Sequence, residues 1–120
     1  MKKIVVVDDN QMFLETLKNL IEIQTDFNCV IFSHPGDALQ HILTEKDVYA
    51  VVSDYEMPQM DGLTLVKQFI GKYPTMKIIV MSGHHTDYLK KRTQKAGIDE
   101  SKVTLLCKSD IINLVVLLNN

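Results

Sequence analysis

The sequence KIVVVDD, at residues 3–9, sets the pattern on which the fold depends. Its β-branched run from Ile4 to Val7 ends abruptly at two carboxylates, Asp8 and Asp9. A short apolar run with such a sharp end is typical of a buried strand. The run is also too short for the hydrophobic region of a signal peptide, although Met1-Lys2-Lys3 resembles the basic start of one. The first residues therefore predict a strand and not a segment for export.

Short β-branched runs of this kind recur along the whole chain and alternate with stretches of helical period. Strands are predicted at five places: Lys3 to Val7, Asn28 to Phe32, Tyr49 to Ser53, Lys77 to Met81 and Val103 to Leu106. Strands that alternate with helices favour a parallel sheet with helices on its faces. The 120 residues, of which 46% are hydrophobic and 23% charged, suit one folded domain, so we expect a single α/β domain over residues 1–120.

Two of the predicted helices raise specific expectations. Apolar residues at helical spacing from Leu65 to Ile70 predict a third helix that reaches residue 70. The last helix, from about residue 111, is apolar on all sides, with Ile112, Val116 and Leu117 opposite the stripe that contains Leu114. Such a helix is either packed into the core on two sides, or it presents a surface that meets another chain.

Charge and hydropathy exclude several classes of function. Thirteen basic and fifteen acidic residues give a formal net charge of -2, so we expect neither direct nucleic-acid binding nor attraction to an anionic membrane. The basic cluster Lys90, Lys91, Arg92 and Lys95 is interpreted as a solvated helix face. All apolar runs are far shorter than the roughly 20 residues of a membrane span. We expect a cytoplasmic protein.

Polar residues follow four of the predicted strands, at the point where each strand ends. These residues are Asp8 and Asp9, Asp54, Ser82, and Lys108. Because the carboxyl ends of parallel strands share one edge of the sheet, and ligands of open parallel sheets bind there, we expect these side chains to converge. Two carboxylates about 4 Å apart repel each other by about 4 kcal/mol at an effective dielectric constant near 20, so cations must lie among them.

Lys108 supplies one positive charge, and a hard divalent cation suits the remaining oxygen ligands. Mg²⁺ fits this donor set better than zinc does, because neither cysteine nor neutral histidine joins the cluster. His84 and His85, just beyond Ser82, are interpreted as residues of a loop or a helix start.

The motifs at these positions resemble the receiver domain of two-component response regulators over essentially the whole chain. The matching segments are VVVDD at residues 5–9, SDYEMPQMDG at 53–62, IVMSG at 79–83, and Lys108. The resemblance implies a flavodoxin-like, doubly wound sheet of five parallel strands in the order 2-1-3-4-5, with helices on both faces. It also places Cys29 and Cys107 on opposite edges of the sheet, too far apart for a disulfide.

The resemblance also implies a phosphorylation switch and a role for each site residue. Asp54 is expected to accept a phosphoryl group from a sensor histidine kinase or a phosphotransfer protein. The expected Mg²⁺ ligands are Asp8, Asp9, Asp54 and the backbone carbonyl of Glu56. Lys108 is expected to stabilise phosphoryl charge, and Ser82 to bind the phosphoryl oxygens and pass the change to the fourth helix.

The expected partners are the phosphoryl donor and either a downstream protein or a second copy of the chain. The downstream protein or the second copy is expected to contact the face made by the fourth helix, fifth strand and fifth helix. No enzymatic activity is expected beyond phosphoryl transfer to the chain itself and its dephosphorylation. By analogy with the family, Glu56 and His84 are expected to flank the path of the hydrolytic water and to tune the phosphoryl lifetime.

Three features depart from the family pattern. Leu105 replaces an aromatic residue, Ser109 replaces proline, and Asp99 to Lys102 look like an insertion of about four residues. We therefore expect that signalling does not run through the side chain at position 105. The departures leave open a degenerate receiver that binds proteins constitutively. A third possibility, an Mg²⁺-dependent phosphohydrolase, has weak support because neither a cap domain nor a substrate pocket is evident.

Overall fold

Five parallel strands form one sheet in the order β2-β1-β3-β4-β5. In the computed structural model, which describes residues 2–120, the strands are β1 (Lys3–Val7), β2 (Asn28–Phe32), β3 (Val48–Asp54), β4 (Lys77–Ser82) and β5 (Thr104–Cys107). This confirms the predicted α/β class, the parallel pairing and the strand order. The strand predictions were right to within one residue at each end.

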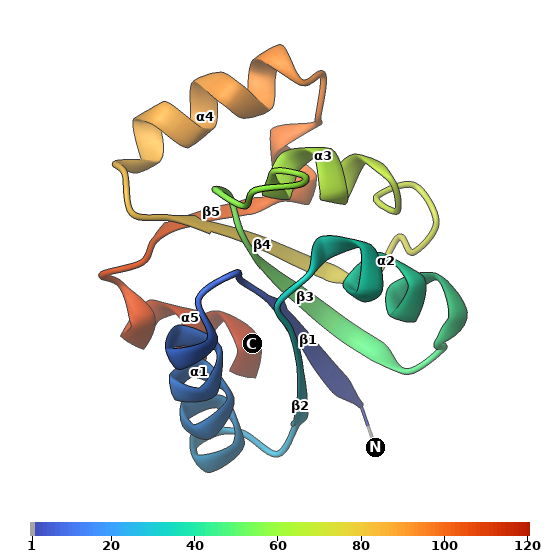
Figure 1. The fold of residues 1–120 in the computed structure, drawn as a ribbon, viewed down its shortest axis with the longest axis vertical. Coiled ribbons are helices and arrows are strands. Elements are labelled where there is room, and N and C mark those ends of the chain that lie inside the picture. The colour runs from blue at the N-terminus through green and yellow to red at the C-terminus, as the bar shows by residue number, and fades with distance from the viewer. Residues whose placement is uncertain (1) are drawn as a thin grey trace.

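Helices cover both faces of the sheet, as Figure 1 shows. They are α1 (Gln11–Gln24), α2 (Pro35–Thr44), α3 (Gly62–Lys67), α4 (Thr86–Lys95) and α5 (Ile111–Asn119), with a short 3₁₀ helix at Glu100–Lys102. Helices α1 and α5 lie on one face, and α2, α3 and α4 lie on the other. Side chains along each strand alternate between these two layers, because successive residues of a strand point to opposite faces.

Two hydrophobic cores result from this alternation. Val5 and Val7 of β1 face the core shared with α2, α3 and α4. Ile4 and Val6 face the core shared with α1 and α5, where they meet Leu14 and other buried apolar residues. The strands are therefore apolar on both sides, as expected for a parallel sheet that is covered on both faces. The site at the strand ends is thus built on a rigid, fully packed support.

The third helix is shorter than its apolar pattern predicts. Helix α3 ends at Lys67, and the chain continues in tight turns, in which the Phe69 backbone N–H donates to the Val66 carbonyl at 3.1 Å. Phe69 is nevertheless buried. Its spacing therefore reflected burial and not an extended helix, because a turn can also direct an apolar side chain into the core.

Helix α5 is buried on one side only. Leu114 and Leu118 are fully buried, whereas Ile112 and Val116 are 82% and 48% exposed. The interpretation that packs this helix into the core on two sides is therefore wrong. The exposed side is an apolar surface, as the second interpretation requires.

Two further expectations concern the cysteines at the edges of the sheet and the possibility of a membrane-spanning helix. Cys29 lies on β2 and Cys107 on β5, the two edge strands, and both thiols are free, as expected. Over residues 2–120, no helix combines the length and the hydropathy that crossing a membrane requires.

Candidate functional site

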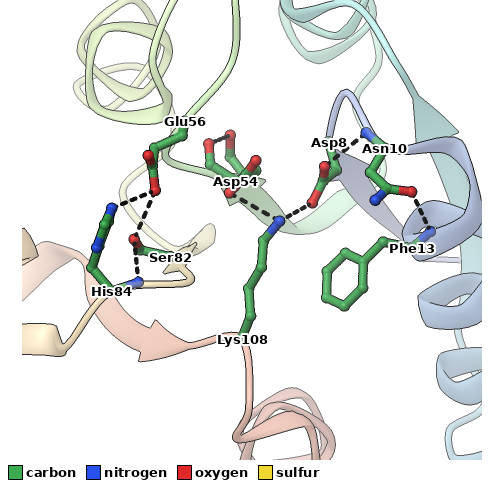
Figure 2. A network of polar contacts seen from close by, with 9 residues as sticks. Asp8, Asn10, Phe13, Asp54, Glu56, Ser82, His84 and Lys108 are labelled. Atoms are coloured by element: carbon green, nitrogen blue, oxygen red, sulfur yellow. Dashed lines mark hydrogen bonds and ion pairs between the residues drawn. The ribbon is translucent and has the colours of Figure 1, made fainter.

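The carboxyl edge of the sheet brings together the polar residues that follow the strands (Figure 2). Asp8 follows β1, Asp54 and Ser82 are the last residues of β3 and β4, and Lys108 follows β5. Asp8 and Asp54 are nearly inaccessible, at 1% and 5% exposure, whereas Asp9 is exposed. Carboxylate oxygens of Asp8, Asp9 and Asp54 all lie within 4.8 Å of one another. The sequence-based expectation that these groups converge is met by the geometry.

Backbone packing holds Asp54 at the edge. The Tyr55 backbone N–H donates to the Met81 carbonyl at 2.8 Å, and the Gly62 N–H donates to the Tyr55 carbonyl at 2.8 Å. A Cβ atom at position 62 would lie 2.3 Å from the Asp54 carbonyl oxygen. Only glycine allows this close approach. The adjacent Asp61 caps α3 by accepting a hydrogen bond from the Thr64 N–H at 2.8 Å.

Lys108 bridges the two buried carboxylates. Its Nζ lies 2.8 Å from Oδ2 of Asp8 and 3.3 Å from Oδ1 of Asp54. Figure 2 shows the ammonium between these two groups, with the Phe13 ring beside it. The Nζ lies 4.7 Å from the centre of that ring, within the range of a cation–π interaction. Residues of β3, of α1 and of the loop between β1 and α1 therefore hold the ammonium in place.

One ammonium does not fully compensate two buried carboxylates. Burial, followed by the charge of Asp8, raises the pKa of Asp54 from 3.8 to about 6, although Lys108 and the Glu56 backbone act in the opposite direction. Burial by itself lowers the pKa of Lys108, but its hydrogen bond to Asp8 and the charges of Asp54 and Asp8 outweigh burial and raise that pKa. The site therefore has excess negative charge and favours a further cation.

The donor set fits Mg²⁺. All three clustered side chains offer carboxylate oxygen, the ligand that this hard cation prefers, and the exposure of Asp9 leaves one side open to water. Mg²⁺ usually keeps several of its waters and takes only a few carboxylates from a protein. Neither histidine near the site belongs to this cluster, since the His84 side chain contacts Glu56 and His85 caps α4. The expectation that both histidines lie at a loop or helix start is confirmed.

A second polar chain leads away from the carboxylates toward α4. Ser82 Oγ accepts from the His84 backbone N–H at 3.0 Å and donates to Oε1 of Glu56 at 3.4 Å. The same Glu56 oxygen lies 3.2 Å from Nε2 of His84. The His84 ring lies 5.1 Å from the ring of Tyr88 on α4, measured between centroids. These contacts connect the end of β4 with an exposed side chain of α4.

Two contacts at the site were not predicted from the sequence. Phe13 was not expected to lie beside Lys108, and Glu56 and His84 were not expected to contact each other. Both contacts join residues that are distant in the chain, so neither periodicity nor local motifs can reveal them. The nearest sequence signal was the position of Glu56 and His84, each two residues beyond a strand-end polar residue.

Comparisons with known proteins agree on one protein family. The family model described as the response regulator receiver domain matches residues 4–104. Transcriptional regulatory protein DegU of Brevibacillus brevis is 25% identical over 95 residues, which cover 79% of this chain and 40% of that protein. Transcriptional regulatory protein FlgR of Helicobacter pylori is 36% identical over 84 residues, which cover 70% of this chain and 21% of that protein.

Solved structures show the same fold. A response regulator receiver domain protein (CheY-like) from Methanospirillum hungatei matches with a TM-score of 0.82 and 23% identity, over 99% of this chain and 91% of that chain. A receiver domain from Clostridium thermocellum matches with a TM-score of 0.82 and 24% identity, over 100% and 93% of the two chains. The chain spans less than half the length of the two curated relatives above.

Proposed function

Because the chain belongs to the family of response regulator receiver domains, we propose that it is a phosphorylation-activated switch of a two-component system. Asp54 accepts a phosphoryl group from a histidine kinase or a phosphotransfer protein. The observation that carries this proposal is the convergence of three carboxylates and one lysine at a single edge of the sheet. In this proposal residues 1–120 form one receiver domain that acts in the cytoplasm.

Asp54 is suited to act as the nucleophile. Its Oδ atoms lie at the end of a rigid strand, and the Gly62 contact fixes the backbone that carries them. A carboxylate oxygen forms the new bond to phosphorus while the bond from phosphorus to the donor histidine nitrogen breaks. Positioning contributes most to such a reaction, because the transition state of phosphoryl transfer is loose.

The remaining residues stabilise charge. Lys108, already 3.3 Å from Oδ1 of Asp54, can contact a phosphoryl oxygen on that carboxylate with a small movement. Asp8, Asp9, Asp54 and the Glu56 backbone carbonyl would hold Mg²⁺. When bound, Mg²⁺ supplies positive charge against the phosphoryl oxygens. Ser82 can exchange its weak hydrogen bond to Glu56, at 3.4 Å, for a stronger one to a phosphoryl oxygen.

Output is proposed to pass along α4. If Ser82 releases Glu56, the Glu56 carboxylate that contacts His84 loses its hydrogen bond from Ser82. The His84 ring already packs against Tyr88, so a change at His84 can reach α4. Tyr88 is 40% exposed, so a partner can contact it. A downstream protein or a second copy would then bind the face of α4, β5 and α5, where Ile112 and Val116 are also exposed.

Phosphorylation by a small donor tests the function directly. The chain is incubated with acetyl phosphate and Mg²⁺ and examined by intact-mass spectrometry. A persistent phosphoryl adduct that is absent in Asp54→Ala supports the switch, and Asp26→Ala, an exposed carboxylate outside the site, serves as the matched control. A chain without any adduct is a constitutive binding module instead. Rapid turnover of many phosphoesters identifies a phosphohydrolase.

The lifetime of the adduct provides a further test. Glu56→Asn removes the carboxylate that contacts both Ser82 and His84, so we expect the decay rate of the phosphorylated chain to change several-fold. Decay is followed by intact mass after removal of acetyl phosphate. An unchanged decay rate contradicts a role of Glu56 in tuning the lifetime.

A further inference from the structure

The amino ends of β4 and β5, opposite the carboxylates, border three adjoining hollows. The first has a volume of about 600 Å³, and the others have volumes of about 280 and 250 Å³. The first and second hollows share Tyr73, Pro74 and Met76, and the first and third share Ile70 and Lys102. We call these hollows together the amino-end groove. None of the proposed phosphorylation-site residues lines it.

The lining of the first hollow is largely apolar. Ile70, Tyr73, Met76, Ile78 and Leu117 contribute to it. Its volume lies within the range of about 300–1,000 Å³ that is typical of ligand sites. The hollow can therefore accept one or two apolar side chains.

The apolar lining is held in place by specific contacts. Nζ of Lys77 donates to the Leu117 carbonyl at 2.7 Å and so fastens the end of α5 to β4. The Tyr73 hydroxyl donates to the Ile42 carbonyl at 3.1 Å and fixes the loop before β4 to α2. The hollow is therefore bounded by packed and hydrogen-bonded elements.

The groove carries exposed positive charge on its borders. Five exposed lysines line the groove, and within the described residues none of these five forms a salt bridge: Lys2, Lys46, Lys67, Lys72 and Lys102. Two acidic residues also border the groove. Asp47 lies 3.9 Å from Nζ of Lys3, and Asp99 accepts two hydrogen bonds from Ser101. The border is therefore positive in a chain whose formal net charge is -2.

We propose that the amino-end groove binds an acidic peptide segment of a partner protein, with apolar side chains in the hollow and carboxylates against the lysines. Charge complementarity selects the acidic partner, and the apolar lining requires hydrophobic anchors within it. A nucleic acid fits less well, because phosphates would leave the apolar hollow unfilled. The chain's single arginine, Arg92, also lies elsewhere, on α4.

The binding test uses defined peptide mixtures and the unphosphorylated full chain. The ¹⁵N-labelled protein is titrated with peptides of about eight residues that combine Asp or Glu with Leu, Ile, Phe or Met. We expect saturable amide shifts at Met76, Lys102 and Thr104, with a dissociation constant of about 100 μM or tighter. A mixture with lysine in place of the acids should give none. An acidic mixture with serine in place of the apolar residues should bind at least about tenfold more weakly.

Charge-reversed variants locate the site. Lys72→Glu combined with Lys102→Glu should weaken binding of the acidic mixture by about tenfold or more. Both lysines are exposed, so the fold should tolerate the change. Lys90→Glu combined with Lys91→Glu on α4 changes the net charge equally and should leave affinity within about twofold. Asp54→Ala should also bind normally, which separates this inference from the proposed phosphorylation.

Four results would overturn the proposal. The first is the absence of saturable shifts up to about 1 mM of the acidic mixture. The second is shifts that cluster on α4. The third is equal weakening by the two double variants. The fourth is tighter binding of a single-stranded polyuridine oligonucleotide to the same residues.

Discussion

Asp54 is a buried carboxylate that shares one ammonium with Asp8. Its pKa rises on folding from 3.8 to about 6, first because of burial and then because of the Asp8 charge. At pH values between these two pKa values, the folded state therefore binds more protons than the unfolded state does. Stability should fall as the pH rises through this window, and the cost should be complete above it. A buried carboxylate is thus kept at the site at the expense of stability.

Asp54→Asn should stabilise the metal-free domain at about pH 8 by roughly 1–3 kcal/mol, because it removes the buried charge and keeps the shape. Near pH 4 the advantage should largely disappear, because the wild-type carboxyl is then protonated in the folded state. Urea unfolding in the presence of a chelator at the two pH values measures the difference. Equal stability of the two proteins at the higher pH would show that Asp54 carries no such cost.

Gly62 determines the backbone geometry behind Asp54. Gly62→Ala should destabilise the domain by about 2 kcal/mol or more, because the new Cβ would lie 2.3 Å from the Asp54 carbonyl oxygen. Gly71→Ala is the matched control, since a Cβ there has no neighbour within 4 Å and should change stability by less than about 1 kcal/mol. Urea unfolding compares the two. Similar effects of both substitutions would contradict the steric explanation.

Helix α4 and strand β5 differ in how they connect with the site. Tyr88 of α4 contacts His84 and Tyr55, with centroid distances of 5.1 and 6.0 Å. Leu105 of β5 is partly buried against the core beneath α2, α3 and α4. An aliphatic side chain in that core lacks the polar contacts that connect Ser82, Glu56 and His84. We therefore expect a change at the site to reach α4 through these contacts and not through the side chain at position 105.

Tyr88→Ala should reduce the amide chemical-shift changes that acetyl phosphate and Mg²⁺ produce in α4, because it removes the contact with His84. Leu105→Ala should leave most of these changes in place. ¹⁵N NMR before and after phosphorylation measures both, with intact mass confirming equal adduct levels. Loss of the α4 changes in Leu105→Ala, without loss of stability, would assign the coupling to β5 instead.

The two ends of the sheet have opposite electrostatic character. The carboxyl end holds three clustered carboxylates and one lysine, whereas five exposed lysines border the groove at the amino end. The formal net charge of -2 does not reveal that negative and positive charges gather at opposite ends of the sheet. A cation and an acidic segment can therefore bind the same domain at distant sites, each attracted to a different end.

Mg²⁺ should stabilise the domain by about 2.7 kcal/mol at a concentration of 100 times its dissociation constant, because it binds the folded carboxylate cluster. Asp9→Asn should remove most of this gain, since Asp9 is the exposed member of the cluster. Asp26→Asn, at an exposed position outside the cluster, should keep it. Thermal unfolding with Mg²⁺ and with chelator measures the gain. Full stabilisation of Asp9→Asn would place the cation elsewhere.

Hydrophobic period and strand-end chemistry were sufficient to predict a parallel sheet covered by helices and the convergence of Asp8, Asp54, Ser82 and Lys108. These features are local in sequence, and parallel pairing brings every carboxyl end to one edge. The strand order followed only from the family resemblance. The apolar pattern did not reveal where α3 ends, because Phe69 is buried from a turn and so continues the spacing of a helix.

Tertiary structure alone placed Phe13 beside Lys108 and joined Glu56 to His84. It also gathered lysines from Lys2 to Lys102 around one groove, whereas the sequence displayed only the basic run near Lys90. Such groups come from segments far apart in the chain, and the folded backbone brings them within reach of one another. Pattern along a chain reports which residues are buried, but the contacts between distant exposed residues depend on how the elements pack.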